Sequence, residues 1–106
     1  MQVLRFTFGR PVFSDDGIQR FHVGMPAGAK VLRVAVLKTL GETEAFLWAL
    51  VDPAAPRETR SITVYRTGVS LHWQDVGPYI GSFEWGDWLL HVFDGGAVQP
   101  VSAHHG

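Results

Sequence analysis

Residues 79–93, YIGSFEWGDWLLHVF, decide the fold class of this chain. Two runs in which apolar residues alternate, 79–85 and 88–93, are separated by Gly86 and Asp87. Alternating runs joined by two turn residues are the strongest short-range signal for a β-hairpin. The stretch therefore predicts a hairpin, and a hairpin is stable in water only when further strands cover its apolar face.

Alternation with a period of two extends over most of the remaining chain, and turn residues separate the runs. In residues 3–8, Leu4, Phe6 and Phe8 share one face of an expected strand. Similar runs occupy residues 18–23, 30–37, 45–51 and 59–67. We expect an all-β fold, a single small antiparallel sandwich or open barrel of about six to seven strands, with at most one short helical turn around residues 70–75.

Two of these runs, 30–37 and 45–51, are apolar or nearly apolar on both faces, so we expect both strands to be central. Run 45–51 has the alternative of a buried helix, but the flanking turns favour a strand. Trp48 lies within it and is expected in the core. Run 59–67 is β-branched and places Arg60 and Arg66 on one face, which predicts an edge or solvent-facing strand.

The chain has 106 residues, 46% of them hydrophobic, which suffices for one hydrophobic core. We expect residues 1–94 to form a single β domain. Residues 95–106 have no apolar pattern and are expected to be a flexible tail. His104 and His105 in that tail lack the fixed geometry of a metal site.

Several classes of protein are excluded by composition. The chain has no cysteine, so disulfides, thiol catalysis and thiolate metal sites are absent. No apolar run approaches the roughly 20 residues of a membrane helix, and the N-terminus does not look like a signal peptide, so we expect a soluble, unexported protein. The net charge of -1 gives no strong nucleic-acid signal, although all nine Lys and Arg residues lie at or before Arg66.

Motifs of the common catalytic and nucleotide-binding sites do not occur. The chain lacks Gly-x-Ser-x-Gly, His-Glu-x-x-His and both glycine-rich phosphate-binding patterns. His22, His72 and His91 lie in three separate segments, so a hydrolase or metal site built on them is the weakest alternative. We expect no enzyme activity, no metal and no cofactor.

The most suggestive residues are arginines and aromatic residues on and after the run 59–67. Guanidinium groups together with aromatic rings are how proteins hold a phosphorylated base. The alternative is a solvated strand face with a tryptophan that covers the core. The candidate ligand-binding residues are Arg57, Arg60, Arg66, Thr67, Gly68, Trp73 and Tyr79.

Trp85 and Trp88 flank the turn of the predicted hairpin. We expect at least one of them to project as an exposed anchor, because exposed aromatic residues are typical of interfaces. A β domain of this size also has unpaired edge strands, which favours a homo-oligomer.

Short motifs in order along residues 18–94 resemble a small phage and prophage protein family that carries only a domain-of-unknown-function label. They are MPAGAKVL at 25–32, LWALVDP at 47–53, RTG at 66–68, YIGSF at 79–83 and HVF at 91–93. The resemblance implies a phage or prophage gene expressed in the cytoplasm of a bacterial host, and it implies no activity. Val69 departs from the family pattern, in which a histidine follows Thr-Gly.

The sequence therefore predicts a non-enzymatic phage accessory protein that acts by binding. It would sequester a small nucleotide signal or block a host defence protein. The alternative is a phage structural or morphogenesis module that uses an exposed aromatic hairpin.

Overall fold

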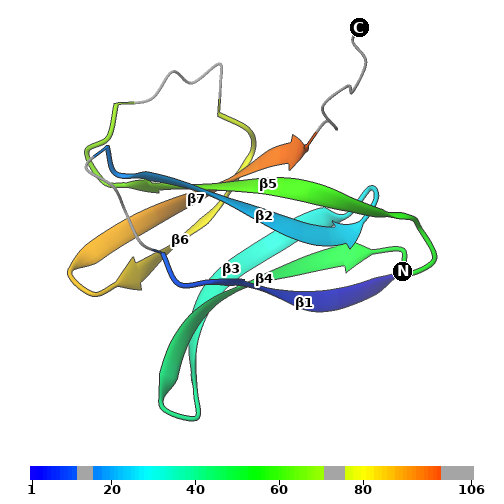
Figure 1. Cartoon of the computed structure of the whole chain (residues 1–106), viewed down its shortest axis with the longest axis horizontal. Coiled ribbons are helices and arrows are strands. Elements are labelled where there is room, and N and C mark those ends of the chain that lie inside the picture. Colours follow the sequence, from blue (N-terminus) through cyan, green and yellow to red (C-terminus); the bar gives the residue numbers. More distant parts are fainter. Residues whose placement is uncertain (12–15, 71–75, 99–106) are drawn as a thin grey trace, which may run out of the picture.

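The computed structural model describes residues 1–11, 16–70 and 76–98. These residues form an all-β sandwich of two antiparallel sheets without a closed barrel, as the sequence predicts (Figure 1). The described part of the chain contains no helix that could span a membrane. The strands are β1 (Gln2–Gly9), β2 (Ile18–Pro26), β3 (Lys30–Thr39), β4 (Glu42–Val51), β5 (Arg57–Arg66), β6 (Tyr79–Trp85) and β7 (Trp88–Ala97).

One sheet has three strands in the order β1-β4-β3, and the other has four strands in the order β2-β5-β7-β6. The predicted hairpin is β6 and β7, with Trp85 paired to Trp88 across the turn. Gly86 has a φ of 61° there, a left-handed conformation that glycine adopts without a Cβ clash. Strand β7 continues to Ala97, so the first residues of the expected tail belong to the sheet. Residues 71–75, the place of the expected helical turn, lie outside the described part.

The predicted positions of two strands within the sheets are wrong. β5, expected at an edge, is central and pairs with both β2 and β7. Its outer face is polar in composition but covered, because Thr63 and Tyr65 are each only 8% exposed. β3, expected to be central, is an edge strand of the three-stranded sheet. β4 is central as predicted.

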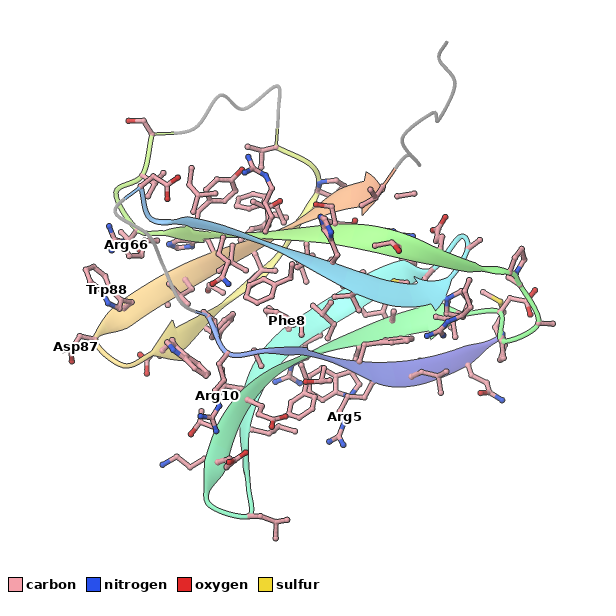
Figure 2. The ribbon with its side chains drawn as sticks, viewed as in Figure 1. Arg5, Phe8, Arg10, Arg66, Asp87 and Trp88 are labelled. Atoms are coloured by element: carbon pink, nitrogen blue, oxygen red, sulfur yellow. The ribbon has the colours of Figure 1, made fainter. Side chains whose placement is uncertain are left out.

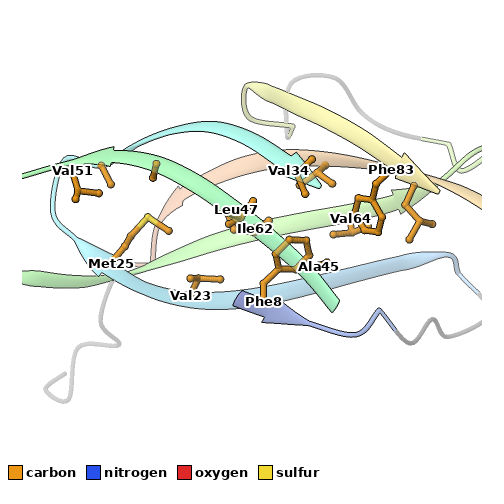
Figure 3. Packing of buried hydrophobic residues seen from close by; sticks show 14 residues of the cluster. Phe8, Val23, Met25, Val34, Ala45, Leu47, Val51, Ile62, Val64 and Phe83 are labelled. Carbon is orange, nitrogen blue, oxygen red and sulfur yellow. The ribbon is translucent and has the colours of Figure 1, made fainter. Parts of the chain in front are cut away.

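The core lies between the two sheets and is built from alternate residues of the strands (Figure 3). Phe8 links the sheets through edge-to-face contacts, with ring centroids 5.0 Å from Phe21 and 6.2 Å from Phe83. The predicted face of β1 covers the core at Phe6 and Phe8, whereas Leu4 on the same face is 36% exposed. The largest fully buried side chains are Met25, Leu47, Val51, Ile62, Val64, Leu90 and Val92.

Candidate functional site

Arg60 is buried, and its guanidinium is bound by other parts of the chain. Its Nη1 donates to Asp94 Oδ2 at 2.8 Å, and its Nη2 donates to Glu58 Oε1 at 3.1 Å and to the carbonyl of Ala29 at 2.9 Å. The side chain is 9% exposed. Arg60 therefore connects β5, β7 and the turn between β2 and β3. Both of its Nη atoms are used in these contacts, so they are not available to hold a ligand.

The other two candidate arginines lie at opposite ends of β5, about 30 Å apart at the rise of an extended strand. Arg57 donates from Nη2 to the carbonyl of Gly24 at 3.2 Å. Arg66 lies over the ring of Trp88, 4.5 Å from its centroid (Figure 2). The three arginines of β5 therefore do not converge.

The remaining candidates also lie apart. The hydroxyl of Thr67 donates from Oγ1 to the carbonyl of Leu89 at 3.0 Å. The same Oγ1 atom lies 2.8 Å from His91 Nε2. Gly68 is exposed in the turn after β5. Tyr79 is 58% exposed and contacts Phe93, which pairs with Thr63 on the outer face of the four-stranded sheet. Arg66 lies on the inner face of that sheet with Ile62 and Val64, so Tyr79 and Arg66 are on opposite faces. Trp73 and His72 lie outside the described residues.

The hairpin tryptophans differ in exposure. Trp85 is half-buried and packs edge-to-face on Phe83 at 6.2 Å. Trp88 is 48% exposed and lies beside Leu89, which is 44% exposed. Trp88 is thus the exposed residue of the two. Figure 2 shows it at the β6-β7 turn together with Asp87 and Arg66.

The outer face of the three-stranded sheet carries a different set of residues. Trp48 in β4 pairs with Arg5 in β1 on one side and with Arg33 in β3 on the other. Ala45 and Leu47 are in the core, so Phe46 and Trp48 point to the opposite side of β4. We call this surface the Trp48 face; it consists of Val3, Arg5, Lys30, Arg33, Phe46, Trp48 and Leu50.

One aromatic residue of the Trp48 face, Phe46, is packed against a cation and against Trp48. The Arg5 guanidinium lies 4.5 Å from the ring centroid of Phe46, and the rings of Phe46 and Trp48 are 6.4 Å apart. Phe46 is only 6% exposed, although it faces away from the core. In Figure 2, Arg5 and the core residue Phe8 lie on opposite sides of β1. Trp48 is half-buried on this outer surface, so the expectation that it belongs to the core is wrong.

The charge of the Trp48 face is positive. Arg5, Lys30 and Arg33 are all exposed. Among the described residues of β1, β3 and β4, the acidic ones are Glu42 and Glu44, both at the hairpin end of β4, and Glu44 lies on the outer side two residues before Phe46. Glu42 is 3.3 Å from Arg10, which offsets its charge. An anion at Trp48 therefore meets mostly cations.

The sequence match identifies the family. The family model described as Domain of unknown function (DUF7352) matches residues 15–102. The chain belongs to this family. No curated protein and no solved structure matches the chain. The DUF7352 match covers β2 to β7, so it includes Arg33 and Trp48, while Arg5 in β1 precedes it. The expected resemblance to a family with only a domain-of-unknown-function label is confirmed at that level.

The Trp48 face of this DUF7352 domain carries groups that can bind a ligand. The described residues contain no group of three His, Asp or Glu side chains that can hold a metal ion. The Trp48 face offers a ring for stacking and guanidinium groups for charge-assisted hydrogen bonds. No sequence motif signals this face, because Arg5, Arg33 and Trp48 come from three strands and meet only through the register of the sheet.

Proposed function

We propose that this DUF7352 protein is a non-enzymatic binding protein whose Trp48 face holds a nucleotide. The observation that carries the proposal is the row Arg5, Trp48 and Arg33 across three neighbouring strands. A tryptophan ring stacks on any nucleobase, and guanidinium groups bind phosphate with planar, bidentate geometry. A nucleotide combines both of these chemical features in one ligand.

The apolar composition of the outer side of β4 supports a ligand there. The outer face of an antiparallel sheet is usually polar when it meets water. On β4, however, Phe46, Trp48 and Leu50 follow one another on the outer side. A second copy of the chain is the less favourable occupant, because a two-fold axis through the face brings arginines against arginines. An anionic ligand with a flat apolar part matches both the charge and the surface.

The biological setting that we propose is a phage or prophage accessory protein in the host cytoplasm, where it sequesters a small nucleotide signal or blocks a host defence protein. The motifs MPAGAKVL at 25–32 and LWALVDP at 47–53 support it. We also propose a homo-oligomer, because the sandwich has four edge strands, β1, β2, β3 and β6. Size-exclusion chromatography with light scattering measures the number of subunits in the oligomer.

A titration with ATP, followed by isothermal calorimetry and by thermal shift, tests the proposed function. Binding to the native state raises the melting temperature. We expect Trp48→Ala and Arg33→Gln to weaken the binding. Trp88→Ala and Arg20→Gln are matched controls, because both residues are exposed and belong to the four-stranded sheet. Equal losses in the control variants would place the site elsewhere.

The β6-β7 hairpin favours a second candidate function, that of a structural or morphogenesis module. Trp88 and Leu89 are adjacent and each is nearly half exposed, which fits contact with a protein partner. The test is mass spectrometry of purified phage particles for this chain. Detection of the protein at stoichiometric levels in the particles supports this candidate function, provided that the Trp88→Ala variant is no longer incorporated. Absence of the parent protein from the particles excludes this candidate function.

A further inference from the structure

We infer that the Trp48 face takes single-stranded nucleic acid in preference to a free mononucleotide. The inference rests on the proposed function and concerns the same face. Its basis is that Arg5 and Arg33 are the strand-pairing partners of Trp48, one strand away in each direction, with the Arg5 guanidinium over the neighbouring ring of Phe46.

The two-sided arrangement of the cations matches a chain rather than a single nucleotide. Neighbouring strands are about 4.8 Å apart, so the backbones at Arg5 and Arg33 are separated by about 10 Å across Trp48. A free mononucleotide carries its phosphates on one side of the base. An internal nucleotide of a strand has one phosphodiester before it and another after it. With its base stacked on Trp48, such a nucleotide directs one phosphate toward each arginine.

The face also extends beyond one base. Leu50 points to the same side as Trp48, about 7 Å further along β4. It pairs with Val3 on one side and with Lys30 on the other. This second row supplies an apolar surface and a third cation for a neighbouring nucleotide. Phe46 is covered by Arg5, so it holds that guanidinium in place instead of stacking a base.

The shape of the surface favours single strands over duplexes. The Trp48 face is one side of a sheet, and its aromatic ring offers a surface on which a base can lie. In a duplex the faces of the bases are already stacked on one another, and a protein reaches only their edges through the grooves. Splayed bases of a single strand present the faces that a tryptophan can use.

The number of cations on the Trp48 face sets the expected salt dependence of the binding. Up to three phosphates can meet Arg5, Lys30 and Arg33. Each phosphate contact with a single strand changes the slope of log K against log salt by about 0.7, so a total slope of about -2 is expected. Because net charge averages over the whole surface, it does not report cations gathered on one sheet.

Fluorescence anisotropy with a labelled thymidine oligonucleotide of about eight residues tests the inference. We expect the dissociation constant of the oligonucleotide to be at least about tenfold lower than that of thymidine monophosphate, measured by competition. The reason is that the oligonucleotide contacts both the Trp48 row and the Leu50 row of the face. Trp48→Ala is expected to weaken binding by about 5- to 150-fold, the range of losing one stacked base. Arg33→Gln is expected to lower the salt slope by about 0.7.

The controls separate this inference from the proposed function. Arg20→Gln and Trp88→Ala should bind as the parent does, and Arg33→Gln, a change at an exposed position, keeps the test valid if Trp48→Ala fails to fold. If the monophosphate binds as tightly as the oligonucleotide with the same variant pattern, the inference fails and the proposed function stands. If neither binds, both fail.

Three further outcomes overturn the inference. One is equal affinity for a duplex of the same length. Another is competition by poly-glutamate as strong as that of the oligonucleotide, which makes the face a binder of acidic peptides. The third is loss of self-association in Arg33→Gln, measured by light scattering, which assigns the face to a second copy of the chain.

Discussion

Replacing Arg60 by Met removes a buried guanidinium and keeps an unbranched side chain that fills similar space. The parent side chain is 9% exposed and donates to Asp94, to Glu58 and to the carbonyl of Ala29. Methionine has no donor. Two carboxylates and one carbonyl therefore lose their hydrogen bonds to Arg60, and the carboxylates lose its charge.

The size of the effect follows from how much solvent reaches these groups. Breaking a fully buried ion pair costs about 3–5 kcal/mol. The side chains of Asp94 and Glu58 remain 16% and 25% exposed, and Asp94 Oδ1 also accepts the amide of Gly96 at 2.8 Å. We therefore expect the free energy of unfolding to fall by about 2–4 kcal/mol. For a domain of this size, the melting temperature falls by roughly 10–25 °C.

Urea unfolding followed by tryptophan fluorescence measures this change as a lower midpoint with an unchanged slope. Arg57→Met is the matched control, because Arg57 is exposed and makes one hydrogen bond to Gly24, and it should cost less than about 0.5 kcal/mol. A double-mutant cycle with Asp94→Asn should give a coupling energy of at least about 1 kcal/mol. If Arg60→Met unfolds within about 0.5 kcal/mol of the parent, the ion-pair network does not stabilise the fold as described.

Three other predictions concern the backbone and a hydrogen bond. Leu40 is fully exposed with a φ of 51°, so Leu40→Asn should raise the free energy of unfolding by about 0.5–1 kcal/mol in the same urea assay; a decrease would contradict this. In Gly77→Ala the new Cβ meets the backbone oxygen of Asp94, and circular dichroism should show a melting temperature lowered by more than about 10 °C, whereas an unchanged value would refute the close approach. Thr67→Val removes the side-chain hydrogen bond to the carbonyl of Leu89, and we expect the free energy of unfolding to fall by about 1 kcal/mol. Amide hydrogen exchange at the start of β7 should become faster. No change in either measurement would exclude a role for this bond.

The sequence predicted what depends on neighbours along the chain. The β6-β7 hairpin is encoded locally, since Gly86 and Asp87 separate two alternating runs. The position of a strand within a sheet depends on distant partners, and there prediction failed. The polar outer face of β5 is covered, whereas Leu32 and Arg33 of the nearly apolar strand β3 are exposed, so composition indicates the reverse of the observed strand order.

The candidate site shows the same limit. The period of two correctly places Arg60 and Arg66 on one face of β5. Alternation does not say which face points inward, and Arg60 lies on the face that also carries the core residues Ile62 and Val64. Sequence patterns do not reveal the Trp48 face, because apolar residues on both sides of β4 predict a fully buried strand. Arg5 and Arg33 become neighbours of Trp48 only through strand pairing, which no local pattern reveals.

Chemical-shift mapping by NMR during titration with the thymidine oligonucleotide tests the central claim most directly, because it locates the ligand without any substitution. We expect the shifts to concentrate on Arg5, Arg33 and the indole of Trp48, and the outer face of β5 and β7 to remain unaffected. Shifts that instead cluster at Arg66 and Trp88, or no shifts at saturating ligand, would contradict it.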